Sequence, residues 1–342
     1  MPRARILSTG LYAPERVVPN SYFDALYGED VSRFLVANRN IRERRYAAPD
    51  QAPSDLAVAA AHQALDRAGV DPEDLDLIVV STDTPDYLSP ATASVVQHKL
   101  GATGAGTFDL NTACAGFVTA LDVASKYVAA EPEQYGRVLV VGTYLMSRFL
   151  DFRQRNIASL FADGAGAVVV GPSEDGQAGI LASMLEAEGQ YAEHMGIYAG
   201  GAAAPIQPAA GDGAAPDAAP LPHAPEVQLL EFRQKFPKTF NLDHWTRLVR
   251  RLAERTGVPP EAVDRFFFTQ INVGSIRETM DALGLPQERA HLVMDRYGYT
   301  GNACVAMALA DADQQGLLTP GQTYFLIASG GGASLAAMAV RW

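Results

Sequence analysis

Short apolar runs alternate with amphipathic stretches along most of the 342-residue chain. The clearest runs lie at residues 77–80, 138–141, 165–170, 266–268 and 324–328. Continuous apolar runs of this length are typical of strands that are buried on both faces of a sheet, and the stretches between them carry a helical period. The pattern therefore predicts an α/β fold with its strands in the interior.

One arrangement of elements occurs twice, at Gly69 and again at Gly257, 188 positions later. Each time a helical pattern ends at the glycine, a loop with proline follows, and a buried strand begins. We interpret this as a duplication into two similar halves, residues 1–172 and 173–342. Residues 199–225 are rich in Ala, Gly and Pro without an apolar period. They are either an insertion with little structure or a lid over a substrate tunnel.

Composition excludes several classes of protein. The formal charge of −12 argues against nucleic-acid binding, which needs a basic surface. We expect no membrane span, since no apolar run approaches about 18 residues, and no charged-then-apolar leader precedes the first strand. Cys114 and Cys304, the only two cysteines, have neither metal-ligand spacing nor the number for a disulfide framework. The expectation is a cytoplasmic protein without a metal.

Cys114 is the strongest candidate for chemistry. Small residues flank it, and an apolar helical pattern begins directly after it at Phe117. A thiol at the start of a helix feels the positive end of the helix dipole, which favours a thiolate. A thiolate can attack a thioester and carry the acyl group covalently. The alternative is a buried cysteine that serves as a small hydrophobic residue.

Four segments decide between these interpretations, because together they resemble the thiolase superfamily and, within it, β-ketoacyl-ACP synthase III. They are residues 41–49, 113–117, 161–167 and 317–332, and the resemblance covers nearly the whole chain. It implies a homodimer of duplicated, five-layered αβαβα subunits. It also implies transfer of an acyl group from CoA or acyl carrier protein to Cys114, with the oxyanion held by backbone N–H groups of Cys114 and Gly331. No resident cofactor is implied, since the thioester is a substrate.

Two positions depart from the family pattern. The catalytic His is replaced by Thr269, although Gln270 and Asn272 after it match, and the catalytic Asn is replaced by Tyr299. The hydroxyls of Thr269 and Tyr299 can donate hydrogen bonds to a substrate, but neither shuttles protons near neutrality as imidazole does. We therefore expect acylation of Cys114 to survive and ordinary decarboxylative condensation to be weak or replaced.

Two more residues are candidates for the missing functions. Asp83 falls where the related hydroxymethylglutaryl-CoA synthases carry a catalytic Glu, and a carboxylate near an apolar tunnel has a raised pKa suited to a base. Asn302 lies three positions after Tyr299 and is a candidate amide donor to the pocket. The alternative for both is an ordinary turn or loop-capping role.

The expected pantetheine channel also departs from the family. Phe34 and Asn38 occupy the places of a Trp and an Arg that sandwich the CoA adenine, whereas Arg155 resembles a phosphate-facing Arg. Weaker stacking shifts the expected preference from CoA toward a carrier-protein donor. The basic segment 233–255 is either a docking site for an acidic carrier protein or a solvated helix face.

These observations predict an acyltransferase or condensing enzyme that uses Cys114 and works in specialised, polyketide-like or fatty-acid-like metabolism. Two alternatives stay open. One is a non-decarboxylative condensation with Asp83 as base. The other is a non-catalytic subunit that binds a carrier protein or partner synthase, although the intact Cys114 and the glycines at 330–332 argue against it.

Overall fold

Two β-sheets form the centre of the computed structural model, which describes residues 3–173, 176–206 and 228–342. The first sheet has the strand order β1-β7-β6-β4-β5. Its strands are β1 (Ala4–Tyr12), β4 (Leu77–Ser81), β5 (Gly106–Leu110), β6 (Val138–Leu145) and β7 (Asp163–Pro172). β4 pairs in parallel with β5 and β6, whereas β7 runs antiparallel to β1 and β6.

The second sheet has the order β11-β12-β13-β8. Its strands are β8 (Gly179–Ala187), β11 (Arg265–Phe268), β12 (Thr323–Gly330) and β13 (Ser334–Arg341). β11 and β12 are parallel, and the other pairs are antiparallel. The remaining strands form two small antiparallel sheets. One pairs β2 (Arg16–Pro19) with β3 (Glu43–Tyr46), and the other pairs β9 (Met195–Ile197) with β10 (Leu230–Phe232).

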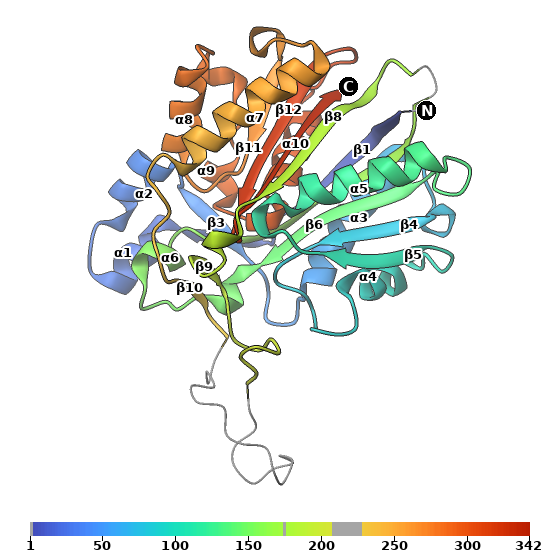
Figure 1. Cartoon of the computed structure of the whole chain (residues 1–342). Coiled ribbons are helices and arrows are strands. Elements are labelled where there is room, and N and C mark those ends of the chain that lie inside the picture. Colours follow the sequence, from blue (N-terminus) through green and yellow to red (C-terminus); the bar gives the residue numbers. More distant parts are fainter. Residues whose placement is uncertain (1–2, 174–175, 207–227) are drawn as a thin grey trace.

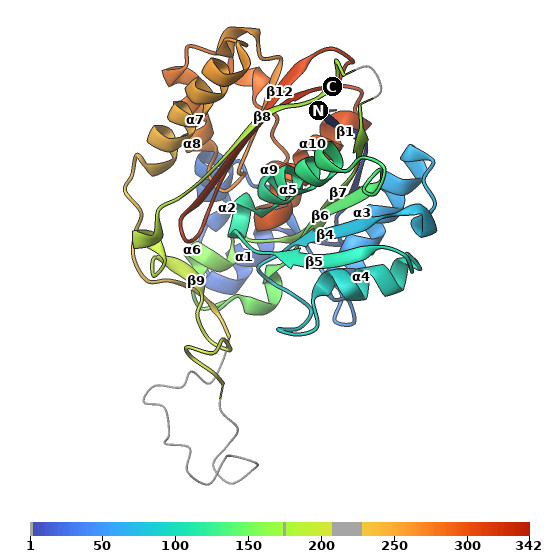
Figure 2. The ribbon, with the colours of Figure 1, turned by 45° about the vertical axis from the view of Figure 1, so that its right-hand side comes forward.

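Helices fill the space between the sheets and cover their outer faces. α5 (Gly116–Ala130) and α10 (Cys304–Gln314) lie in the middle, as Figure 2 shows. α3 (Pro53–Ala68) and α4 (Thr92–Leu100) cover the first sheet, and α7 (Phe240–Thr256) and α8 (Val273–Ala282) cover the second (Figure 1). This is the predicted five-layered αβαβα arrangement, and all five predicted strands are present.

The shorter helices gather at one end of the layers, near β9 and β10 (Figure 1). They are α1 (Asn20–Tyr27), α2 (Val31–Arg39) and α6 (Arg155–Ala158), whereas the short α9 (Met294–Tyr297) packs against β3. Most of the predicted insertion at 199–225 lies outside the described residues.

The two junctions that repeat in the sequence have the same local form in the structure. α3 ends at Gly69, which has a left-handed φ of 63°, and a short 3₁₀ turn leads into β4. α7 ends at Gly257 with a φ of 71°, and a 3₁₀ turn leads into β11 in the same way. Glycine tolerates this backbone conformation without a steric cost, so it ends both helices cleanly.

The central helix corrects one expectation from the sequence. Residues Ala113–Ala130 do reach the length and composition of a membrane span, with a mean hydropathy of 1.2. However, 67% of this segment is buried inside the protein, where α5 packs between the two sheets. A helix that is mostly buried by its own chain is apolar over most of its surface, so its composition is accounted for by the fold.

Candidate active site

Cys114 lies in a cleft of about 870 Å³ that opens toward α2, α6 and the start of α7. Among the described residues that line this cleft, six side chains are cationic and none is a carboxylate. The cations are Arg39, Arg153, Arg155, Arg233, Lys235 and Lys238. In a chain with a net charge of −12, such a cleft attracts anionic ligands.

A strained turn presents the nucleophile. Cys114 sits in the 3₁₀ turn Ala113–Ala115, between the end of β5 and the start of α5, and is 3% exposed. Ala113 before it has a φ of 47°, a left-handed conformation that costs a non-glycine residue about 1–2 kcal/mol. Its N–H donates to Asn111 Oδ1 at 2.9 Å, which helps to hold the turn. Strain of this kind concentrates at functional sites.

A glycine turn packs directly against the nucleophile's backbone. A Cβ on Gly330, the last residue of β12, would lie 2.6 Å from the Cys114 nitrogen, so no larger residue fits there. Gly331 lines the cleft beside it, and its N–H makes no hydrogen bond to another described residue. The structure therefore brings the predicted Gly331 next to Cys114. Two backbone donors near a thiol are the components of an oxyanion hole.

The thiol itself is not in the state that the sequence predicted. Burial raises the pKa of Cys114 well above its ordinary value, and the nearby Asp83 and Cys304 raise it further. A hydrogen bond from the Tyr299 hydroxyl opposes this shift without reversing it. The predicted thiolate is thus wrong for the unliganded site, because desolvation outweighs the favourable helix terminus. The thiol must lose its proton as it reacts.

Tyr299 is the side chain that covers the nucleophile. It is 1% exposed, lines the cleft and packs on Phe161 with ring centroids 5.2 Å apart. Its backbone N–H donates to Leu160 O at 3.0 Å, which anchors the loop. Burial and the neighbouring thiols raise the pKa of Tyr299, so it stays a neutral hydrogen-bond donor.

Thr269 does not face the cleft, so its predicted role as a donor to substrate is wrong. Its hydroxyl is used within the second sheet, where it accepts from Ser329 N at 3.0 Å and contacts Ser329 O at 3.3 Å. The side chain is 1% exposed and joins the ends of β11 and β12.

Asn272 lies at the mouth of the cleft and caps α8. Its Oδ1 accepts from Gly274 N at 3.0 Å and from Arg39 Nη1 at 2.9 Å, and its Nδ2 donates to Ser275 Oγ at 3.2 Å. The geometry makes it a helix cap that also positions Arg39.

Asn302 is buried behind Cys114 rather than in the cleft, so its predicted role as the pocket's amide donor is wrong. It is fully buried, and its Oδ1 accepts from Ser81 Oγ at 2.6 Å. Its amide faces Asp83, whose Oδ1 is enclosed and has no hydrogen-bond partner among the described residues. Burial raises the pKa of Asp83 to about 6, although Asn302 lowers it in part. Asp83 is not among the residues that line the cleft.

The predicted cofactor-binding residues separate into two groups. Arg155 lines the cleft and pairs with Glu29. Phe34 and Asn38 lie on the exposed surface of α2 and are not among the residues that line the cleft, so their place beside a CoA adenine stays a prediction. Phe34 is 47% exposed and carries the Arg39 guanidinium 5.6 Å from its ring centroid.

Sequence reasoning missed several cleft residues. Arg39 directly follows Asn38, so a shift of one position would have found it. Lys235 and Lys238 belong to the predicted basic segment and line the cleft. Asn241 and Ser329 also line it, and nothing in the sequence pattern singles them out.

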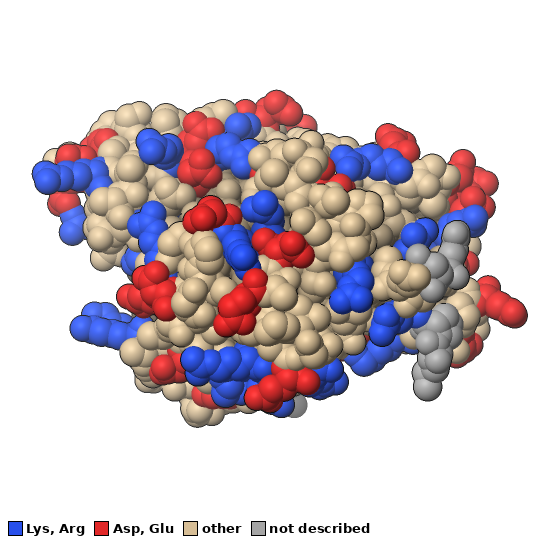
Figure 3. Space-filling view, turned by 90° about the horizontal axis from the view of Figure 1, so that it is seen from above, with Lys and Arg blue, Asp and Glu red and all other residues tan. Residues whose placement is uncertain are grey.

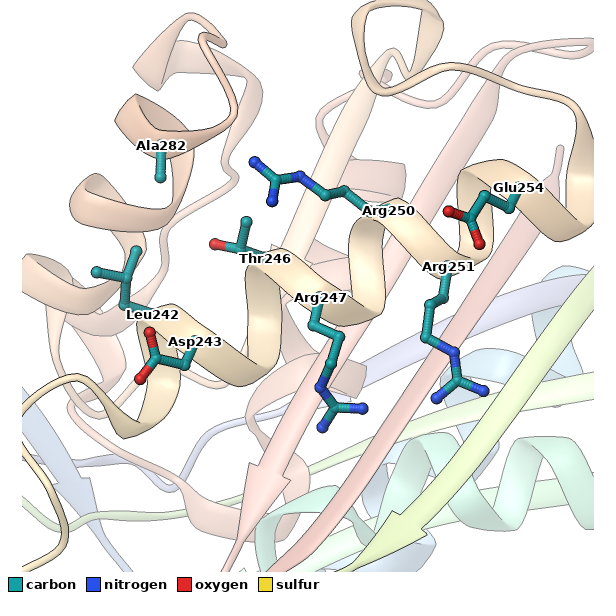
Figure 4. A pocket seen from close by; sticks show the side chains of 8 residues that line it. All are labelled: Leu242, Asp243, Thr246, Arg247, Arg250, Arg251, Glu254 and Ala282. Atoms are coloured by element: carbon teal, nitrogen blue, oxygen red, sulfur yellow. The ribbon is translucent and has the colours of Figure 1, made fainter.

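The rest of the basic segment 233–255 lies on the outer face of α7, beside a second hollow of about 550 Å³ (Figure 4). Arg250 extends toward α8, whereas Arg247 and Arg251 extend toward β8 and pair with Glu186. Asp243 and Glu254 also line this hollow, so its charge is mixed. Cys114 does not line this hollow, so it is separate from the candidate site.

The described residues contain no cluster of three or more His, Cys, Asp or Glu side chains that could hold a metal. Both cysteines are free thiols.

Comparisons with known proteins give one consistent family. Residues 108–189 match the profile of 3-oxoacyl-[acyl-carrier-protein (ACP)] synthase III, and residues 253–342 match that of its C-terminal region. A β-ketoacyl-[acyl-carrier-protein] synthase III from Caldanaerobacter subterraneus is 36% identical, covering 99% of this chain and 98% of the relative. An acetoacetyl CoA synthase, NphT7, from Streptomyces sp. strain CL190 is also 36% identical, covering 99% of each.

Solved structures agree. The 3-oxoacyl-[acyl-carrier-protein] synthase III from Aquifex aeolicus VF5 has a TM-score of 0.86 at 30% identity, covering 99% of this chain and 100% of that one. The priming β-ketosynthase of the R1128 polyketide biosynthetic pathway has a TM-score of 0.87 at 30% identity, covering 99% and 96%.

Proposed function

Because this chain belongs to the β-ketoacyl-ACP synthase III family of thiolase-fold condensing acyltransferases, we propose that Cys114 carries an acyl group between two substrates. The donor is an acyl-CoA or an acyl carrier protein, and the acyl-enzyme passes the group to a second substrate. The observation that carries the proposal is the strained turn that holds Cys114 against Gly330 and Gly331 at the base of the cleft.

In the first step, the Cys114 sulfur attacks the acyl carbon of the donor thioester. A new S–C bond forms, the carbon–sulfur bond to the donor thiol breaks, and the donor leaves with a proton as a free thiol. Negative charge on the acyl oxygen passes through an oxyanion that the backbone N–H groups of Cys114 and Gly331 stabilise. Donors fixed in advance toward such an oxygen contribute about 3 kcal/mol each.

Asp83 accepts the proton of Cys114 in this proposal. Two properties support the role: its pKa of about 6 suits a base near neutrality, and its charge is close enough to raise the pKa of the thiol. Because Asp83 does not line the cleft, it acts on the nucleophile from behind. This placement disfavours the alternative in which Asp83 removes a proton directly from a substrate.

The donor's phosphopantetheine arm enters along the cationic cleft. CoA and carrier proteins share this arm, and its phosphate suits the cations Arg155, Lys235 and Lys238. The names of the relatives include both a carrier-protein enzyme and a CoA enzyme. An acidic carrier protein docks at the cleft mouth against Lys235 and Lys238, and the working unit is a homodimer, as the resemblance implies.

Transfer from Cys114 proceeds without the usual His and Asn pair, since Thr269 is turned into the sheet and Tyr299 covers the thiol. A carbon, hydroxyl or amine nucleophile attacks the acyl carbon, the C–S bond breaks, and Cys114 recovers its proton. A role in specialised metabolism is supported by likeness to the R1128 priming ketosynthase.

A single-turnover experiment tests this second step. The protein is acylated with acetyl-CoA, the excess is removed, and malonyl-CoA or malonyl carrier protein is added. We expect CO₂ release to be the slow step, well below the rate of acylation. Rapid CO₂ release in step with loss of the acetyl group would contradict the proposal that standard decarboxylation has been weakened.

A further inference from the structure

Two side chains that were predicted to donate hydrogen bonds in the cleft do not line it. Thr269 bonds to the backbone of Ser329, and Asn302 is fully buried outside the cleft lining. A second substrate with a carbonyl group still needs a donor where its oxygen becomes negative. Asn241 lines the cleft at the first turn of α7, beside the end of β12 that carries the glycine turn.

Hydrogen bonds from the buried interior fix the orientation of Asn241. The Trp245 indole N–H donates to Ser329 Oγ at 3.2 Å, and Ser329 Oγ donates to Asn241 Oδ1 at 2.9 Å. An indole N–H only donates, so the hydroxyl hydrogen of Ser329 is directed to the Asn241 carbonyl. Trp245 is fully buried, which makes this relay rigid. The NH₂ end of Asn241 is therefore left free for the cleft.

The same relay ties Asn241 to the nucleophile. Ser329 is held by Thr269 through its backbone N–H, and the next residue, Gly330, packs against the Cys114 nitrogen. Asn241, Ser329, Gly330 and Cys114 all line the same cleft. The Asn241 amide is thus held in position relative to an acyl group on Cys114. It is connected through the hydrogen bond to Ser329, the peptide bond to Gly330 and the packing of Gly330 on the Cys114 backbone.

We propose that Asn241 is a catalytic residue whose Nδ2 donates a hydrogen bond to the carbonyl oxygen of a carbon-nucleophile acceptor. This inference rests on the proposed function. When a malonyl-type acceptor thioester loses CO₂, the electron pair of the broken C–C bond stays on its α-carbon and is shared with that oxygen as an enolate. The α-carbon then bonds to the acyl carbon, the C–S bond to Cys114 breaks, and the sulfur takes up a proton.

Two variants test the donor. In Asn241→Ala the NH₂ group is absent, and Asn241→Asp keeps the shape but places an acceptor at the oxygen. We expect acylation of Cys114 by acetyl-CoA to stay within about twofold, whereas consumption of the acetyl group by malonyl-CoA falls about 10²-fold, as for loss of one such donor. In Asn241→Asp this rate recovers as the pH is lowered, because a protonated carboxyl donates again.

Asp243→Asn is the matched control, since Asp243 lies two residues along α7 and faces the outer hollow in Figure 4. Its rates stay at the wild-type level. Equal loss of acylation and transfer in both Asn241 variants, with no pH recovery, would show a merely structural role and overturn the inference. Transfer at the wild-type rate in both Asn241 variants would also overturn the inference. The same holds if the wild-type acyl-enzyme forms but neither malonyl-CoA nor acetyl-CoA consumes its acyl group. Failure of the wild type to acylate at all would instead refute the proposed function.

Discussion

Among single residues, Asp83 has the most unusual surroundings. Its carboxylate is close enough to Cys114 to raise the pKa of the thiol, one of its oxygens is enclosed and unpaired, and burial holds its own pKa at about 6. A charge in such a place destabilises the folded state, because water solvates the same group better in the unfolded chain. Keeping this charge next to a buried thiol therefore lowers the stability of the folded protein. Titratable groups with perturbed pKa values of this kind are common at catalytic sites.

This penalty gives a pH-dependent prediction. The folded pKa of Asp83 is about 6 and the model-compound value is 3.8, so the folded state binds more protons between these pH values and stability falls as the pH rises through them. Above about pH 6 the full penalty applies, at most about 3 kcal/mol for a shift of this size. We expect Asp83→Asn to raise the free energy of unfolding at pH 7.5, and the gain to vanish near pH 4.

Urea unfolding at both pH values measures the effect. A variant that is equally or less stable than the wild type at pH 7.5 would show that the carboxylate is well solvated or well paired, contrary to this description. The same variant should form the acyl-enzyme more slowly if Asp83 accepts the thiol proton.

The position of the nucleophile could be predicted from the sequence more accurately than the positions of the side chains around it. Cys114 and Gly331 could be placed together because both lie in short motifs whose backbone makes the site. Thr269 and Asn302 were misplaced because the direction of a side chain depends on partners far along the chain, Ser329 and Ser81. Asn241 was missed for the same reason, since its significance comes from a relay that only tertiary structure assembles.

At the level of elements, the critical junction is the start of α5, where it crosses β4 and the turn before α10. A Cβ on Gly116 would lie 2.0 Å from Ser81 Oγ and 2.6 Å from Asn302 Oδ1. These two atoms belong to the hydrogen bond that supports the Asp83 region. The glycine therefore lets α5, and with it Cys114, approach the first sheet closely.

We expect Gly116→Ala to destabilise the protein by about 1–3 kcal/mol, because the added methyl group forces packed atoms apart. Gly104→Ala is the control, since a Cβ there has no heavy atom within 4 Å. Chemical denaturation of both variants measures the difference, and acylation of Cys114 reports any displacement of the nucleophile. Equal midpoints for the two variants would contradict the tight junction.

Strands with continuous apolar runs were predictable, and those with mixed patterns were not. β1 has Ser8 and Thr9 in its buried part, where their hydroxyls bond to Ala64 O and Asp313 Oδ2, both at 2.6 Å. Polar residues that find partners across the fold remove the apolar signal from the sequence. β13 is rich in alanine, which favours helices in isolation, and is a strand because β12 and β8 pair with it on both sides.

At the level of the whole molecule, charge is distributed unevenly in a way that suits the proposed substrate. The chain carries a net charge of −12, and on the face shown in Figure 3 acidic and basic side chains are interspersed. The cleft is lined by six cations and no carboxylate among the described residues. Such a cleft attracts anionic ligands, although Arg153, Arg155 and Arg233 are each paired with a carboxylate outside the cleft lining.

We expect the double variant Lys235→Glu, Lys238→Glu to raise KM for acyl carrier protein about tenfold or more with little change in kcat, and to weaken the dependence of kcat/KM on salt. Steady-state kinetics at low and at physiological ionic strength measure both. Arg250→Glu, on the outer face of α7, is the control. A larger effect of Arg250→Glu would place carrier docking at the outer hollow instead.

Covalent acylation of Cys114 is the central claim, and intact mass spectrometry tests it most directly. The protein is incubated with acetyl-, longer acyl- and malonyl-thioesters on CoA and on carrier protein, beside Cys114→Ala. We expect an adduct with the mass of one acyl group on the wild type and none on the variant. No adduct from any donor, or an adduct that persists in Cys114→Ala, would contradict it.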